Sequence, residues 1–319
     1  MNLSQEQENL LTLCALRHED HTLDWHLLAR TSQSPAGLEA LLNGDIPEES
    51  TAARRCLPIL RGALAEGLDD ARARAETELE AAEKAGAELV TVIDAHYPDN
   101  LRLVPNLPPF LFHRGPLQPT DARSVAVVGT RNATDIGLKR AARMARGLVE
   151  HDVAVFSGLA KGVDAAAHQA TLDAQGRTVA VMGTGIAARI YPAENRPLAD
   201  RILAEGGALL SQFWPTSPPA KWTFPRRNVV TSGATMGSVV IEASSTSGAK
   251  MQARIAAEHG KQVFLLRSLA TAQPWARKML DEHRATEVTD LDDVLQRLTT
   301  PERIHQASQQ RIQLALAVL

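Results

Sequence analysis

The 319-residue sequence has few aromatic residues, which make up 4% of the chain, so alanine, valine and leucine must fill most of the core. Its two cysteines, Cys14 and Cys56, lie too far apart for a disulfide framework or a zinc ribbon. The histidines form no metal-binding pattern, and no apolar run approaches the ~18 residues of a membrane span. The N-terminus is polar and acidic, unlike a secretory signal. We therefore expect a cytoplasmic protein that binds neither a metal nor a membrane.

An excess of positive charge is also missing. The sequence has 34 basic and 37 acidic residues, which gives a formal net charge of -3. The protein as a whole cannot attract a polyanion, so a nucleic-acid site would need a local cluster of cations.

The order of sequence patterns predicts an α/β protein. Helical spacing of apolar residues predicts an N-terminal helical domain at 1–88, and prolines then predict an extended connector packed on the core at 89–119. At 120–298, short runs that are apolar on both faces alternate with helical segments. This alternation indicates a doubly wound, mostly parallel, Rossmann-like sheet. A C-terminal helical tail is expected at 299–319.

Glycines end three of the predicted strands. Gly129 follows the first strand, Gly158 the second, and Gly183 and Gly185 the third. Ligands of parallel sheets bind outside the carboxyl ends of the strands, where glycine lets an anion approach the backbone. A phosphate-binding crevice is therefore expected, with tight turns as the alternative use of these glycines.

Nicotinamide and P-loop sites fit this crevice poorly. The first turn, GTRNATDIG, is not G-x-G-x-x-G, and the second strand ends in Ser157 and Gly158 without the acidic residue that holds a ribose. The next charged residue is Lys161, and no G-x-x-x-x-G-K-[ST] pattern is present. No cofactor is therefore predicted.

Cations cluster around the predicted crevice. Arg131 and Lys161 follow adjacent strands, and the stretch KWTFPRRN adds Lys221, Arg226 and Arg227 among two aromatic residues. Basic groups interleaved with aromatic rings suit single-stranded nucleic acid, because charges follow the backbone and rings stack on bases. Alternatively, the aromatic residues belong to the core and the two arginines cap a helix.

Asp164 and His168 are four residues apart, so they share one face of a predicted helix. An acid–base pair would need a nucleophile nearby, and no Ser-His-Asp or Cys-His arrangement is evident. We expect Asp164 to orient the turn and His168 to be a half-buried histidine with its hydrogen bonds satisfied.

Several motifs together resemble the DNA-processing protein A (DprA, or Smf) family over about 90 to 266. They include VAVVGTRNATDIG, FSGLAKGVDAAAH, VAVMGTGIAARIYPAEN and the F-P-x-R-N stretch. The resemblance implies a Rossmann-like, dimeric, cytoplasmic protein that binds single-stranded DNA without cleaving it and helps to load the RecA recombinase during natural transformation. It assigns DNA binding to Arg131 and Lys161, in a pocket shaped by Gly129, Thr130, Ser157 and Gly158. Asn228 and Lys250 complete the predicted contacts.

Other residues depart from that family. Lys250 and Gln252 stand in SGAKMQA where the family has small, apolar or hydroxylated residues, and the segment after the last strand differs. These differences fall near the family's dimer surface. They favour a divergent member, with a partner encoded in the same competence or phage-defence operon as an alternative to RecA.

A second hypothesis is a nucleotide sensor or a hydrolase like the LOG phosphoribohydrolases. Those enzymes resemble this chain in fold and use a glutamate beside a glycine-rich phosphate turn, and Glu242 occupies a similar strand end. The LOG pattern P-G-G-x-G-T is absent, so we expect Glu242 to orient backbone amides or to pair with Arg226 or Arg227.

Overall fold

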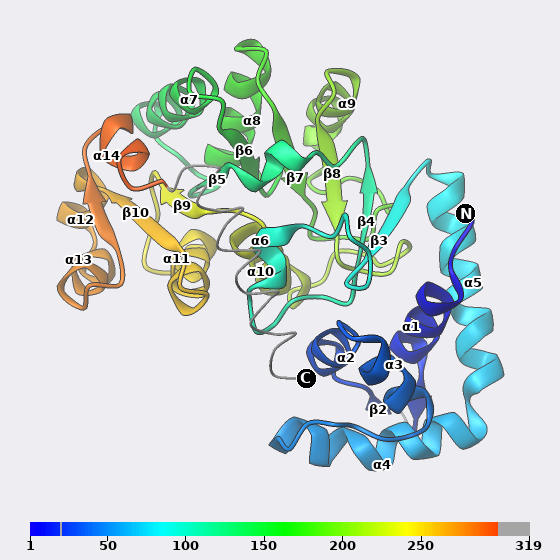
Figure 1. Cartoon of the computed structure of the whole chain (residues 1–319). Coiled ribbons are helices and arrows are strands. Elements are labelled where there is room, and N and C mark those ends of the chain that lie inside the picture. The colour runs from blue at the N-terminus through cyan, green and yellow to red at the C-terminus, as the bar shows by residue number, and fades with distance from the viewer. Residues whose placement is uncertain (20, 299–319) are drawn as a thin grey trace.

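The computed structural model describes residues 1–19 and 21–298, so the expected tail at 299–319 lies outside the described residues. These residues fold around a large mixed sheet that has helices on both faces (Figure 1). The strand order is β11-β10-β9-β5-β6-β7-β8-β4-β3. Neighbouring strands from β11 to β8 are parallel, whereas β4 and β3 are antiparallel. The predicted α/β class with a doubly wound, mostly parallel sheet is confirmed.

The strands of this sheet are short. In chain order they are β3 (Glu88–Thr91), β4 (Phe110–Arg114), β5 (Ser124–Val128), β6 (Ala154–Ser157), β7 (Thr178–Val181), β8 (Ala208–Ser211), β9 (Gly237–Val240), β10 (Gln262–Leu266) and β11 (Thr286–Val288). A separate hairpin pairs β1 (Arg17–His18) with β2 (His21–Thr22).

Helices fill most of the remaining described chain. The N-terminal set is α1 (Gln5–Ala15), α2 (Trp25–Thr31), α3 (Pro35–Leu42), α4 (Thr51–Glu66) and α5 (Leu68–Lys84). The later set is α6 (Asp99–Arg102), α7 (Asp135–Val149), α8 (Val163–Asp173), α9 (Arg196–Ala204), α10 (Thr223–Gly233), α11 (Gly248–Glu258), α12 (Arg267–Ala272), α13 (Pro274–Asp281) and α14 (Leu291–Leu295). Among the described residues, none of these helices is both long and apolar enough to cross a bilayer.

The centre of the sheet follows directly from the sequence pattern. All five residues of β5 are buried, because helices cover both faces of this strand. Val125 of β5 pairs with Val155 of β6 on one side and with Gly237 of β9 on the other. Figure 1 shows α7, α8 and α9 on one face and α10 and α11 on the other. The apolar runs predicted to form a parallel sheet are therefore present as strands β5 to β10, and their carboxyl ends lie along one edge.

The segment expected to be an extended connector at 89–119 contributes strands to the sheet. It contains β4 and most of β3, and β4 pairs antiparallel with β8. The prolines between the two strands conceal this pairing, because they break the apolar runs into pieces shorter than an ordinary strand. The boundaries between the proposed domains remain predictions.

A cluster of aromatic rings joins the N-terminal helices to the sheet. Phe110 of β4 is fully buried, and its ring centroid lies 5.0 Å from that of Trp25 in α2 and 4.7 Å from that of Trp214 after β8. Phe112 adds a further contact at 5.5 Å. Helices and sheet edge thus share one apolar core.

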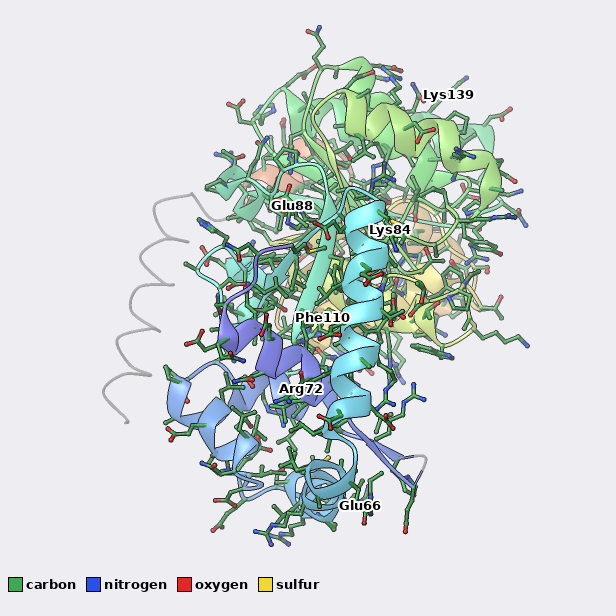
Figure 2. The ribbon with its side chains drawn as sticks, turned by 90° about the vertical axis from the view of Figure 1, so that its right-hand side faces the viewer. Glu66, Arg72, Lys84, Glu88, Phe110 and Lys139 are labelled. Carbon is green, nitrogen blue, oxygen red and sulfur yellow. The ribbon has the colours of Figure 1, made fainter. Side chains whose placement is uncertain are left out.

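A polar contact reinforces this junction. In Figure 2, α5 runs from the N-terminal helices, near Arg72, up to Lys84, where the chain continues to Glu88 of β3. From this helix, Glu78 accepts hydrogen bonds from the Thr216 amide at 2.8 Å and from the Thr216 hydroxyl at 2.6 Å. The loop after β8 is therefore held by a helix that precedes it by more than 100 residues.

Helix α8 is attached to the sheet through His168, which is fully buried rather than half-buried as expected. Its Nδ1 lies 2.7 Å from the Thr178 hydroxyl, which donates to the Val155 carbonyl oxygen at 2.7 Å. Nδ1–H therefore donates to Thr178, while Nε2 has no hydrogen-bond partner among the described residues. Burial, with the charge of Arg227, lowers the pKa of His168 from 6.5 to about 3.

Replacing Phe110 by alanine should lower the free energy of unfolding by about 3–5 kcal/mol, because it removes a buried ring from the aromatic junction. Urea unfolding of both proteins measures this difference. Ile136→Ala is the matched control, because Ile136 is 61% exposed and its loss should change stability by less than about 0.5 kcal/mol. A similar small change in Phe110→Ala would show that the junction adds little.

Acidification should destabilise the protein through His168. Since its folded pKa lies below the unfolded value, the unfolded imidazole gains a proton as the pH falls below about 6.5, while the folded imidazole stays neutral until about pH 3. Between about pH 7 and pH 5, the native protein should lose about 2 kcal/mol more than His168→Gln. Urea unfolding at both pH values provides the test, and equal losses would contradict it.

Candidate nucleic-acid interface

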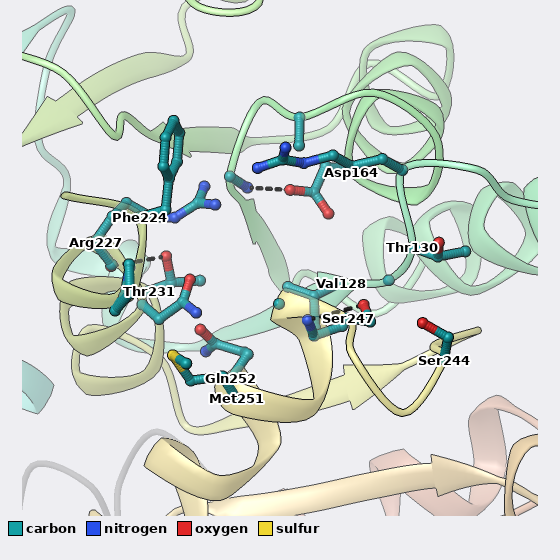
Figure 3. Close-up of a pocket in the computed structure, with 18 of the residues that line it drawn as sticks. Val128, Thr130, Asp164, Phe224, Arg227, Thr231, Ser244, Ser247, Met251 and Gln252 are labelled. Atoms are coloured by element: carbon teal, nitrogen blue, oxygen red, sulfur yellow. Dashed lines mark hydrogen bonds between the residues drawn. The ribbon is translucent and has the colours of Figure 1, made fainter. Parts of the chain in front are cut away.

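A pocket of about 370 Å³ lies at the carboxyl ends of β5, β6 and β9. Figure 3 shows it between the loop after β5, the start of α10 and the start of α11. Its lining is Val128, Gly129, Thr130, Arg131, Asn132, Gly158, Ala160, Asp164, Phe224, Pro225, Arg227, Asn228, Thr231, Ser244, Thr246, Ser247, Gly248, Ala249, Met251 and Gln252. We call this hollow the central pocket.

A buried arginine forms part of the central pocket wall. Arg227 of α10 is 8% exposed, and its Nη1 donates to the Val181 carbonyl oxygen at 3.1 Å. Its Nε has no hydrogen-bond partner among the described residues. The guanidinium lies against Gly158, where a Cβ atom would overlap it. The absent side chain at Gly158 therefore makes room for a cation.

Asp164 of α8 supplies the neighbouring negative charge. Its carboxylate is buried and accepts a hydrogen bond from the Gly158 amide at 3.1 Å (Figure 3). Burial raises the pKa of Asp164, while Arg227 and the amides of Ala160 and Gly158 act in the opposite direction. Burial lowers the pKa of Arg227, Asp164 opposes this, and the charge of Arg131 lowers it further. The lining of the central pocket thus contains two arginines, Arg131 and Arg227, and one carboxylate, Asp164.

Arg131 lies at the exposed side of the central pocket. Its guanidinium carbon is 5.4 Å from the ring centroid of Phe224, which also lines the pocket. The Phe224 ring in turn packs against Gly183, where a Cβ atom would meet the ring at 2.8 Å. This stacking holds the long Arg131 side chain over the pocket while its charge remains available to a ligand.

Hydrogen-bonding groups line the opposite wall. Ser247 caps α11 by accepting a hydrogen bond from the Ala249 amide at 3.2 Å, and Ser244 and Thr246 are exposed beside it. Asn228 of α10 is 8% exposed and also lines the central pocket. Cations, hydroxyls and an amide in one hollow can bind a phosphate together with a polar ring edge.

The central pocket brings together part of the predicted site. Its lining includes the predicted residues Gly129, Thr130, Arg131, Gly158, Asp164, Arg227 and Asn228. Arg131 and Lys161 do not share this pocket, contrary to the expectation of one crevice built by both.

Lys161 lines a second hollow of about 800 Å³, next to the central pocket. There it forms an ion pair with Glu194, and its neighbours include Tyr191 and Thr216. The Tyr191 ring centroid lies 5.5 Å from that of Phe224. This aromatic pair therefore lies between the two hollows: Phe224 lines the central pocket and Tyr191 lines the second hollow.

The remaining predicted glycines and Ser157 have structural contacts. A Cβ atom on Gly129 would meet Val163, and one on Gly185 would meet the Trp214 and Pro215 carbonyls. Ser157 is buried and donates to the Val127 carbonyl oxygen at 2.7 Å. In the described structure, glycine at these strand ends makes room for the protein's own side chains and backbone.

The other predicted residues lie outside the central pocket lining. Lys221 and Arg226 are exposed at the start of α10, and Arg226 stacks over Trp222 at 5.0 Å. Lys250 lies on α11. Glu242 accepts hydrogen bonds from the Thr134 amide at 3.2 Å and hydroxyl at 2.9 Å, at the N-terminus of α7.

Some lining residues were not predicted. The hydroxyl-rich segment Ser244–Ser247 matches no known phosphate-binding motif. Tyr191 and Glu194 belong to the YPAEN stretch that resembles the DprA family, but no role was predicted for either residue. The run of hydroxyls before a helix start could have indicated an anion-binding wall.

Comparisons with known proteins agree with this architecture. The DNA processing protein DprA of Bacillus subtilis is 32% identical over 220 residues, which cover 68% of this chain and 73% of the relative. Protein Smf of Escherichia coli is 36% identical over 184 residues, which cover 58% and 49%. DprA of Streptococcus pneumoniae is 38% identical over 176 residues, which cover 55% and 61%. The chain thus spans about half to three fifths of the length of the last two relatives.

Solved structures show the same fold. The X-ray structure of Streptococcus pneumoniae DprA aligns with a TM-score of 0.72 at 29% identity, over 94% of this chain and 100% of that chain. Helicobacter pylori DprA, described for its single-stranded DNA binding mode, aligns with a TM-score of 0.58 at 22% identity, over 66% and 94%.

A family model described as DNA recombination-mediator protein A matches residues 88–299, which include the whole described sheet and both hollows. Because this match covers more than half of the chain, the protein belongs to the DNA recombination-mediator protein A family, the family of DprA and Smf.

Proposed function

We propose that this protein binds single-stranded DNA at the carboxyl edge of its sheet and acts, without cleaving the strand, in DNA processing and recombination. The observation that carries the proposal is the convergence of Arg131 and Arg227 on one pocket whose rim is an aromatic ring, Phe224. A phosphodiester supplies the negative charge that two arginines and one carboxylate leave unbalanced.

Arg227 places a positive charge in the wall of the central pocket, and this charge favours an anion there. A phosphate oxygen in the central pocket would lie near this guanidinium, the hydroxyls beside α11 and the N-terminus of that helix.

Exposed rings beside the pocket favour an unpaired strand over a duplex. Tyr191 is 46% and Trp222 is 56% exposed, and each lies near a cation, Lys161 or Arg226. Bases can stack on such rings only when they are not already stacked and paired within a duplex. The central pocket also has the volume of a small-ligand site, which suits a single nucleotide.

A nucleotide hydrolase is the weaker alternative. Glu242, the candidate base, is held by Thr134 and lies outside the central pocket lining. Asp164, which does line the pocket, accepts from the Gly158 amide and lies beside Arg227. Incubation with nucleoside monophosphates followed by chromatography separates the hypotheses, since a hydrolase releases free base.

The cellular role is proposed on the family and on the cysteines. We propose that the protein works in the cytoplasm as a homodimer, in natural transformation or in phage defence, with RecA or an operon-encoded protein as its partner. The family description of a recombination mediator supports a RecA-type partner. Cys14 and Cys56 are both buried and unpaired, as is usual in a reducing compartment.

Replacing Arg131 by alanine should weaken binding of an oligothymidylate about tenfold, because one charged phosphate contact is lost. The dependence of log K on log salt should also become shallower by about 0.7. Filter binding with the oligonucleotide, its duplex and AMP measures both quantities and ranks the ligands. Lys84→Ala on α5 is the matched control, since it removes an exposed cation that lines neither hollow. Unchanged affinity in Arg131→Ala, or preference for the duplex, would count against the proposal.

Replacing Glu194 by glutamine should strengthen oligothymidylate binding about twofold to fivefold, because Lys161 no longer pairs with a carboxylate and becomes available to a phosphate. In the same filter assay, Lys161→Ala should weaken binding, and the double variant should behave like Lys161→Ala. Glu258→Gln is the control, since it breaks the exposed ion pair with Arg254 by the same change of charge. Equal effects of the two glutamine variants would exclude Lys161 from the DNA path.

A further inference from the structure

Helix α7 carries positive charge on its outer face, beginning beside the central pocket. It starts at Asp135, three residues after Asn132 of the pocket wall. Three of its exposed cations, Lys139, Arg143 and Arg146, follow one another at intervals of four and three residues and therefore share one face of the helix, and Arg140 lies beside them. We call them the α7 stripe: Lys139, Arg140, Arg143 and Arg146. None forms an ion pair with any residue that the structure describes.

The stability of α7 does not account for this stripe. Lys139 and Arg143 are like charges four residues apart, and like charges at this spacing destabilise a helix. Lys139 lies beyond the first turn, so the helix dipole does not account for it, whereas Arg146 lies in the last turn, where the dipole favours a cation. Other exposed helices of this chain pair their cations along the helix, as Arg201 does with Glu205 and Lys278 with Glu282.

The positions of these cations suit a chain of phosphates. Lys139 and Arg143 are about 6 Å apart along the helix axis, and Arg146 lies about 4.5 Å further on. Arg140 donates to the Ser268 hydroxyl at 2.8 Å, which holds its guanidinium between α7 and the start of α12. Lys139 lies at the outer surface in Figure 2, away from α5.

We propose that the α7 stripe binds the phosphodiester backbone of a single strand whose other end lies in the central pocket. The inference rests on the proposed function, because the pocket supplies the start of the path. An acidic protein partner fits less well. Protein interfaces have an apolar centre, and the exposed face of α7 offers one large apolar side chain, Ile136, at its first turn.

Oligonucleotide length provides the test. A thymidine dinucleotide is short enough to stay in the central pocket, which has the volume of about one nucleotide, whereas an oligothymidylate of about 20 nucleotides also reaches the stripe. The double variant Lys139→Ala/Arg143→Ala should bind the long oligonucleotide about fivefold to tenfold more weakly and the short one unchanged. Its salt slope for the long oligonucleotide should be shallower by about 1.4, for two lost phosphate contacts. Fluorescence anisotropy with the full chain measures both affinities.

Two variants control this experiment. Arg72→Ala/Lys84→Ala removes the same charge from α5, where both residues form ion pairs, and should leave both affinities unchanged. Lys139→Arg/Arg143→Lys keeps the charge and should bind both oligonucleotides like the native protein, which separates charge from any effect on folding.

The outcomes distinguish this inference from the proposed function. Equal affinity of the native and alanine variants for the long oligonucleotide, or equal weakening for both lengths, overturns the α7 path and leaves pocket binding in place. Failure of the native protein to bind either oligonucleotide overturns both proposals. A loss with the long oligonucleotide alone supports the stripe.

Discussion

The arrangement of the central pocket depends on one buried contact, the approach of the Arg227 guanidinium to the backbone of Gly158 beside Asp164. Burial of an arginine is costly unless a carboxylate and hydrogen bonds compensate for lost water. Asp164 compensates from α8, the Val181 carbonyl compensates from β7, and Gly158 leaves the space. Two neighbouring strand ends, those of β6 and β7, are thereby fixed around a buried cation.

Scarcity of aromatic residues makes their distribution informative. Phe110, Phe112, Trp25 and Trp214 join the N-terminal helices to the sheet. A second group lies near the two hollows: Tyr191 and Phe224 line them and contact each other, and Phe213 contacts Trp222, which directly precedes α10. Rings supply a large contact area at low entropic cost. This chain therefore places most of its rings at one structural junction and one candidate binding edge.

The sequence was sufficient for the parallel sheet and for the edge at which the central pocket lies, because apolar runs and terminal glycines are local signals. It was insufficient for β3 and β4, because β4 joins the sheet by pairing with the distant strand β8, and β3 joins it only by pairing with β4. The sequence also did not predict the ion pair of Lys161, since no pattern near that residue indicates Glu194 as its partner. The sequence showed which strand ends carry glycine but not what fills the space beside them. Gly158 leaves room for Arg227, and Gly183 leaves room for Phe224, and each partner is more than 40 residues away in sequence.

The hydrogen bonds from Thr216 to Glu78 have a consequence for the family. Thr216 forms part of the wall around Lys161, so this wall is completed by a helix that lies outside the matched core at 88–299. A chain shortened to that core would retain every strand of the sheet and lose the brace on the loop. The position of the loop beside Lys161 therefore depends on a segment of this chain that precedes the matched core.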